Sequence, residues 1–295
     1  MKGLNPVSRA RRALGRTLRS RVAGADADAR AQVIWGSAGP RWFTRADPIW
    51  RVHEDSAMFS GGIAALLLQM LHPMAMAGVA GHSGYRSDPW GRLQRTSNYL
   101  ASTTYGTIEH AEATIAHVAA IHRRVRGKDA HGRPYGADDP HLLTWVHVAE
   151  IHSFLAAFQA YARRPLTPAE ADTYVAQAGV AAGRLGVPAP PQSVTELRTV
   201  LESYRPELEL TPAAADAAAF LLHDPPLPWP ARPGYWALAA GGVGVLPDWA
   251  RHLLGLDHPA GHLLARPLGR GATATVRWAM SPTSRSRPRP LSAAG

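Results

Sequence analysis

The stretch that decides the fold runs from Ala57 to Ala80 and reads AMFSGGIAALLLQMLHPMAMAGVA. Its apolar residues surround the helix axis, which is typical of a helix buried in a bundle or of a membrane span. Gln69, His72 and Pro73 interrupt the run, and a proline ends or kinks a helix at the residue before it. The sequence therefore predicts a buried central helix that ends near His72, followed by a second apolar piece.

Signals that start helices recur along the rest of the chain. An N-cap residue followed by proline, or by an acidic residue in the first turn, predicts that a helix begins there. Such signals stand at Asp88, Thr107, Asp139, Thr167, Ser193 and Thr211. Strand alternation and internal repeats are not evident. The sequence therefore predicts an all-α fold, a single globular domain of many helices.

The composition limits the chemistry. The chain has 295 residues, 14 histidines and no cysteine. Without cysteine there are no disulfides, iron–sulfur clusters, thiolate haem ligands or cysteine nucleophiles. Any metal must be held by histidine, carboxylate or backbone groups.

The positive charge is concentrated at the N-terminus. The chain carries a formal charge of +10, and residues 1–46 hold ten basic and two acidic residues, a net of +8. Because the rest is nearly neutral, we expect no nucleic-acid partner. The stripe from Arg9 to Arg21 allows at most a weak contact with an anionic membrane surface. No apolar segment follows Arg11-Arg12, so we expect a cytoplasmic protein.

Three parts follow from this distribution. Residues 1–40 are expected to be a flexible basic arm, and residues 41–265 the helical domain. Beyond about Arg266 the chain is rich in Arg, Pro, Ser and Gly, so residues 266–295 are expected to be a disordered tail.

Histidines on apolar helix faces are the candidate metal ligands. One falls within a stripe at helical spacing, which comprises Ala111, Ile115, Val118, His122 and Val125. A buried imidazole beside Arg126 suits haem, with iron on the ring nitrogen and a propionate on the guanidinium. A core histidine bonded to a backbone carbonyl fits the same pattern. His147 lies on a similar face and is a rival ligand, and His72 is a candidate pocket residue.

A further helix carries polar residues at matching positions. Arg92, Thr96 and Tyr99 follow one another at helical spacing after Asp88, with Arg95 on the flank. Such a row is usually a solvated face. On a buried face, Arg92 and Thr96 would place a positive charge and a hydroxyl beside a haem carboxylate or bound O2.

The segment from Asp47 to about Tyr204 resembles the catalytic domain shared by rubber oxygenase (latex-clearing protein) and the endoplasmic-reticulum oxygenase of mycophenolic acid biosynthesis. The order and spacing of five motifs carry the resemblance. They are Leu71-His72-Pro73, Asp88-Pro89-Trp90-Gly91-Arg92-Leu93-Gln94-Arg95-Thr96, Ile121-His122-Arg123-Arg124-Val125-Arg126-Gly127, Gly132-Arg133-Pro134-Tyr135 and Trp145-Val146-His147.

The resemblance implies an all-α haem b enzyme that uses O2 to cleave carbon–carbon double bonds. It implies that His122 is the proximal iron ligand and that Arg92 and Thr96 line the haem pocket, with His147 near. Two departures stand out. Arg95 replaces the distal lysine of rubber oxygenase, and the only acid between His72 and Arg92, where rubber oxygenase has its catalytic glutamate, is Asp88.

The expected function is therefore a haem b-dependent oxygenase or dioxygenase that acts with O2 on an unsaturated apolar small molecule, isoprenoid- or lipid-like. Apolar residues from 63 to 80 are expected to line the substrate cavity. The missing acid favours one alternative, a haem-binding sensor or carrier without turnover. A second alternative is a haem-free helical protein that binds membrane surfaces through its basic arm.

Overall fold

The apolar run forms two helices that meet at a sharp bend. In the computed structural model, which describes residues 6–24, 26–82, 84–257 and 259–281, α4 (Met58–Gln69) and α5 (Pro73–His82) meet at 108°. Pro73 occupies the first position of α5, where its missing N–H costs no hydrogen bond. The predicted break at His72 is confirmed.

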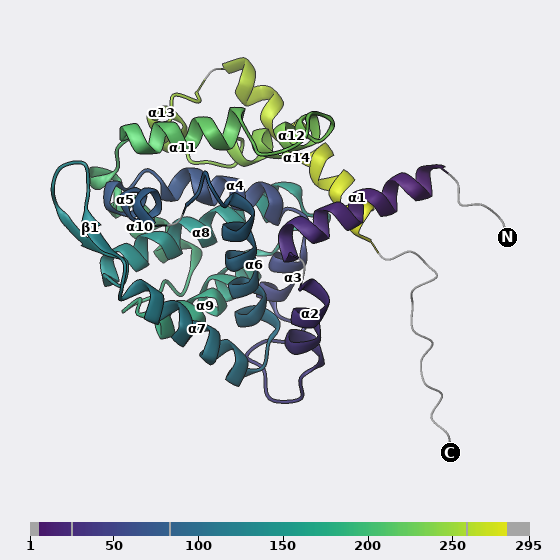
Figure 1. Ribbon diagram of the computed structural model, residues 1–295, viewed down its shortest axis with the longest axis horizontal. Coiled ribbons are helices and arrows are strands. Elements are labelled where there is room, and N and C mark those ends of the chain that lie inside the picture. Colours follow the sequence, from purple (N-terminus) through teal and green to yellow (C-terminus); the bar gives the residue numbers. More distant parts are fainter. Residues whose placement is uncertain (1–5, 25, 83, 258, 282–295) are drawn as a thin grey trace.

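Helix α4 lies along α8 (Pro140–Tyr161), and both are largely buried (Figure 1). The lower part of the molecule in Figure 1 contains α2 (Ala27–Gly36), α3 (Pro48–Glu54), α6 (Pro89–Tyr105), α7 (Ile108–His122) and α9 (Pro168–Leu185). Next to the first turn of α8 lie α10 (Val194–Ser203) and the 3-10 turn η1 (Arg205–Glu207). The core thus forms around the α4–α8 contact.

The last helices cover the opposite side of α4. They are α11 (Pro212–His223), the 3-10 turn η2 (Trp229–Ala231), α12 (Arg232–Val243), α13 (Asp248–Leu253) and α14 (Pro259–Met280). The Ser60 hydroxyl on α4 donates to the Leu238 carbonyl at 3.0 Å, and the Tyr161 hydroxyl on α8 donates to the Gly241 carbonyl at 2.7 Å. These bonds fix the layer of α12 and α14 onto the central pair.

The helix starts agree with the sequence. Side chains of Asp88, Thr107, Asp139, Thr167, Ser193 and Thr211 accept backbone hydrogen bonds as N-caps, and Thr167 forms a complete capping box with Glu170. The all-α prediction is confirmed. The structure also contains a short hairpin that the sequence did not predict, in which β1 (Arg126–Lys128) pairs with β2 (Pro134–Gly136). Helix α7 ends at His122, shortly before β1, so Val125 of the predicted helical stripe lies beyond the helix.

The boundary of the C-terminal tail differs from the expected one. Residues 266–280 belong to α14, whose Val276 and Ala279 are buried, so the helical domain continues past residue 265. Small and apolar residues between the arginines let this segment pack despite its composition. The remainder of the expected tail, residues 282–295, lies outside the described residues.

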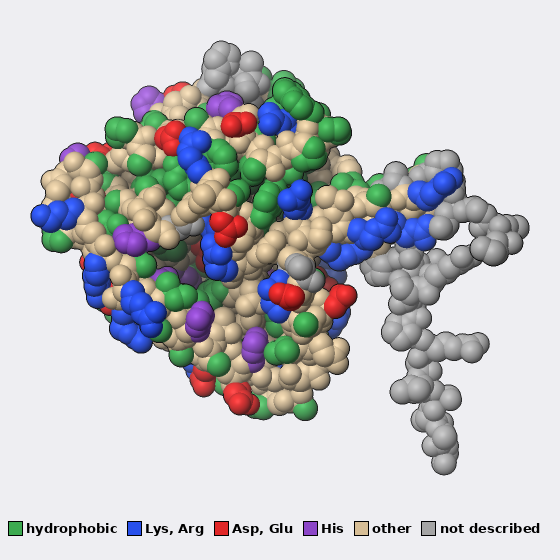
Figure 2. Space-filling view, viewed as in Figure 1, with side chains coloured by type: hydrophobic (Ala, Val, Ile, Leu, Met, Phe, Trp, Pro, Cys, Tyr) green, Lys and Arg blue, Asp and Glu red, His purple; other side chains and the backbone are tan. Residues whose placement is uncertain are grey.

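The basic N-terminal segment contains an ordered helix, α1 (Pro6–Ala23), that contacts α6 and α14. Arg11 donates from Nε to the Trp278 carbonyl at 2.8 Å, and the Gln94 amide donates to the Arg21 carbonyl at 3.3 Å. Arginine side chains line the projecting part of α1 (Figure 2). The arm thus includes a packed segment as well as a charged face.

Only one feature of the described chain has the length and composition of a membrane span. This feature is the α4–α5 pair, which is bent by 108°, and no single described helix meets the test. Most of α4 is buried against other helices, as expected for the central helix of a bundle.

Glycine allows the closest helix contact in the fold, and this yields a stability prediction. A Cβ on Gly241 would lie 2.6 Å from the Gly269 Cα and 2.8 Å from the Ser60 hydroxyl, whereas a Cβ on Gly234 of the same helix would meet open space. Gly241→Ala should therefore lower the free energy of unfolding by about 1–3 kcal/mol through overpacking. Gly234→Ala should raise it by about 0.5 kcal/mol or leave it unchanged. Denaturant melts of both variants check this, and equal effects would contradict the packing.

Candidate functional site

Helix α8 carries two titratable groups into the interior, one turn apart. His147 and Glu150 are three residues apart and so share a face of the helix. His147 is only 7% exposed, and its buried Nε2 has no hydrogen-bond partner. Burial lowers the pKa of His147 to about 4, so the imidazole is neutral at pH 7.

Glu150 is a half-buried carboxyl group on this largely apolar helix. Burial raises its pKa to about 7, and no described residue donates a hydrogen bond to it. Its charge raises the pKa values of Tyr99 on α6 and Tyr174 on α9, in addition to the larger effect of burial. Glu150 is therefore near enough to act on both tyrosines through its charge, and it changes its protonation state near neutral pH, as a general acid or base must.

A half-buried histidine, His53 on α3, belongs to the same group. The Nδ1 of His53 lies 2.8 Å from the Thr104 hydroxyl, and its ring packs edge-on against Phe154 and Tyr174. Burial lowers the pKa of His53 to about 4. The His53 Nε2 and the Tyr174 hydroxyl are both buried without a hydrogen-bond partner. Such orphaned polar atoms are uncommon and mark a place where another molecule belongs.

The polar row on α6 divides between two environments. Arg92 is half-buried, and burial, reinforced by the charge of Arg95, lowers its pKa. Thr96 is exposed, and Tyr99 is half-buried and faces Glu150. Arg95 is exposed and pairs with Asp88 at 3.1 Å. Arg92 and Tyr99, rather than Arg95, are therefore directed inward.

His122 is the last residue of α7 and begins the turn into the hairpin. Its Nδ1 is buried without a hydrogen-bond partner. Burial lowers its pKa, and the nearby Asp138 carboxylate opposes this shift. Arg126 is exposed and forms a two-bond ion pair with Asp138, with Nη2 at 2.8 Å from Oδ2. The Arg126 guanidinium, which the sequence analysis suggests as the partner of a haem propionate, is thus already paired with the Asp138 carboxylate.

The structure therefore forms two groups from the predicted residues and their neighbours. The first, the central group, surrounds Glu150 and contains His53, Tyr99 and Tyr174. The second, the α7 group, contains His122, Arg126 and Asp138. His147 lies one turn before Glu150 on α8, and Arg92 lies two turns before Tyr99 on α6. Because α6 packs against α7, these helices connect the two groups.

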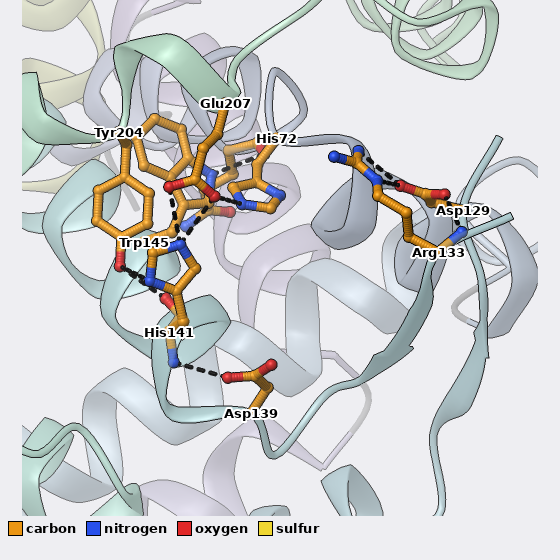
Figure 3. A network of polar contacts seen from close by, with 9 residues as sticks. His72, Asp129, Arg133, Asp139, His141, Trp145, Tyr204 and Glu207 are labelled. Atoms are coloured by element: carbon orange, nitrogen blue, oxygen red, sulfur yellow. Dashed lines mark hydrogen bonds and ion pairs between the residues drawn. The ribbon is translucent and has the colours of Figure 1, made fainter. Parts of the chain in front are cut away.

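His72 belongs to neither group through hydrogen bonds, ion pairs or ring contacts. It is buried at the α4–α5 bend, beside Trp145 and Tyr204, and its Nε2 lies 3.4 Å from Glu207 (Figure 3). The structure thus does not join it to the residues proposed for the pocket.

Sequence reasoning missed Glu150 because it searched for an acid upstream of Arg92, the position implied by the resemblance. The signal that could have found it is the spacing His147-Val148-Ala149-Glu150 on an otherwise apolar helix. A carboxylate on such a helix is seldom buried without a role.

Comparison with known proteins identifies the domain. The family model described as ER-bound oxygenase mpaB/B'/rubber oxygenase, catalytic domain, matches residues 50–278. The match includes both groups of residues and most of α14. No curated protein and no solved structure matches the chain significantly. Because the matched segment covers more than two thirds of the sequence, the chain belongs to the mpaB/rubber oxygenase catalytic-domain family.

Proposed function

We propose that this oxygenase-family protein is a haem b enzyme in which His122 holds the iron. The observation that carries the proposal is the orphaned ring of His122 at the end of α7. A buried imidazole nitrogen without a hydrogen bond loses the stabilisation that water would give it. A metal on the ring would provide that missing partner, and a neutral imidazole is the form that binds iron.

The other residues of the site fit a large, partly apolar cofactor. The orphaned atoms of His53, His147 and Tyr174 belong to different helices, yet all are buried. Arg92 brings a positive charge into the protein, which suits a carboxylate-bearing group. Arg126 is a second candidate partner for such a carboxylate. To bind the cofactor, Arg126 would have to release Asp138, its present partner.

When bound, haem b supplies an iron centre that binds and activates O2. The chain's own residues have separate tasks. His122 orients the cofactor, Arg92 offsets its negative charge, and Thr96 offers an exposed hydroxyl in the middle of the α6 row. Glu150 accepts a proton at its carboxylate above about pH 7 and holds one below it.

We further propose that the substrate is an unsaturated apolar small molecule. Helix α5, which contacts β1, carries half-buried apolar side chains, among them Met74, Ala77 and Val79, while Met76 is fully buried. These side chains offer no charge to a polar substrate, and methionine adapts well to apolar ligands. Glu150 now fills the functional place of the acid that the sequence lacked upstream of Arg92.

The assignment of the iron ligand predicts a difference between three histidine variants. His122→Ala should lose most of the bound haem while keeping its helical signal, because alanine is a good helix former. His117 is an exposed residue on the same helix, so His117→Ala is the matched control and should keep the bound haem. Haem content by absorption checks this. If His147→Ala lost the haem and His122→Ala kept it, His147 would be the ligand.

The roles of the α6 row predict a loss of activity without a loss of cofactor. Arg92→Ala and Thr96→Ala should retain haem but reduce O2-dependent turnover by about tenfold or more, since each removes a positioned charge or hydroxyl. Arg95→Ala, exposed on the same helix, should change turnover little. Normal turnover in both of the first two variants would remove them from the mechanism.

Glu150 predicts a pH dependence with a defined sign. Its raised pKa means that the folded protein holds this proton up to about pH 7, so a step that needs the carboxylate should speed up as pH rises through 7. Glu150→Gln should lose this rise of the rate with pH, and its turnover should be about 100-fold slower. Glu109→Gln, an exposed carboxylate, is the control. An unchanged pH profile in Glu150→Gln would exclude Glu150 as the proton acceptor.

A further inference from the structure

Three side chains from distant parts of the sequence meet outside the two groups of the oxygenase site. His72 comes from the α4–α5 bend, His141 from the first turn of α8, and Glu207 from η1 (Figure 3). One ligand atom from each lies within 4.8 Å of the others. Glu207 Oε2 is 2.8 Å from His141 Nε2 and 3.4 Å from His72 Nε2.

We propose that this cluster binds one divalent transition-metal ion of the zinc type. Two imidazoles and one carboxylate are a common ligand set for such an ion, with water completing the coordination. Ligand atoms on tetrahedral zinc are separated by roughly 3.3 Å, given bond lengths of about 2.0–2.1 Å. The two measured separations lie on either side of that value, so small side-chain movements suffice.

An unsatisfied histidine provides independent support. His72 is 2% exposed, and neither of its ring nitrogens makes a hydrogen bond within the described structure. Its Nε2 nevertheless points at Glu207 across a distance too long for a good hydrogen bond with this alignment. A metal between His72 and Glu207 would satisfy both, whereas the present arrangement leaves a buried imidazole without a partner.

The second histidine is already oriented as a ligand. The Tyr204 hydroxyl donates to the His141 carbonyl at 2.8 Å and lies 3.3 Å from His141 Nδ1. A partner on Nδ1 fixes the ring and leaves Nε2, which faces Glu207, as the coordinating atom. The backbone N–H of His141 donates to the Asp139 side chain at 2.9 Å, which anchors the turn that carries it.

The charge of the surroundings permits a cation. Glu207 brings one negative charge, and the two imidazoles are neutral when they bind metal. The nearest cation that acts on His72 is Arg133, and its charge is offset by Asp129 at 2.7 Å. His141 and Glu207 are half-exposed, so an ion can enter from solvent and retain a bound water.

A metal here would tie the α4–α5 bend to α8 and η1. Backbone and side-chain bonds already join these parts: the Trp145 indole donates to the Gln69 carbonyl at 3.1 Å, and the Glu209 N–H donates to the Leu71 carbonyl at 2.9 Å. The ion would strengthen this junction, and its ligands belong to neither group of the oxygenase site. It is a site separate from the haem and does not depend on haem binding.

The test is Zn2+ binding to the full-length protein, as purified, after dialysis against a chelator. Calorimetric titration should give one tight Zn2+ site per chain, and one equivalent should raise the melting temperature. His141→Ala and Glu207→Gln should each weaken binding by more than about tenfold, because even the loss of an outer-shell partner costs roughly 10–100-fold. Both positions are half-exposed, and circular dichroism verifies that the variants fold.

A neighbouring pair supplies the matched control. His131 and Glu209 are exposed and lie 2.5 Å apart, and the structure assigns no third ligand to them. His131→Ala should therefore keep the tight site and the rise in melting temperature. The proposal is overturned if the wild type binds no more Zn2+ than His141→Ala, or if His131→Ala loses the site equally. Either result would leave the haem assignment untouched, since that is read from absorption.

Discussion

The packing of α8 against α4 is the contact on which the rest of the structure depends. Both helices are apolar on most sides, so each must be covered by other elements to leave water. The bend at Pro73 makes this possible, because it turns the apolar chain away before α4 becomes long enough to project from the domain. Helices α3, α9, α10, α12 and α14 then cover what remains exposed.

Because α8 is buried, the polar side chains on it acquire unusual properties. In water a glutamate is ionised at neutral pH and a histidine is half-protonated near pH 6.5. On α8, burial raises the pKa of Glu150 to about 7 and lowers that of His147 to about 4. The same apolar packing that stabilises the fold therefore produces a neutral imidazole and a carboxyl group able to exchange protons. Stability and chemistry arise from one arrangement.

The sequence predicted most of the fold because its helices are signalled locally. The N-caps at Asp88, Thr107, Asp139 and Thr167, and the break at Pro73, each depend on a few adjacent residues. The extension of α14 past Arg266 was not predictable in this way, since it depends on packing against α1 and α12. Similarly, spacing alone marked His122 and His147 as candidates. The raised pKa of Glu150 and the proximity of His72 to Glu207 depend on tertiary contacts, which the spacing does not reveal.

The central claim is that this family member carries haem b, and the most direct measurement is the absorption spectrum of the wild-type protein. The protein should be produced in cells supplied with a haem precursor and assayed for haem b content after purification. The account predicts a Soret band that shifts on reduction, with about one haem b per chain. Colourless, folded protein that also fails to take up added haemin would contradict it.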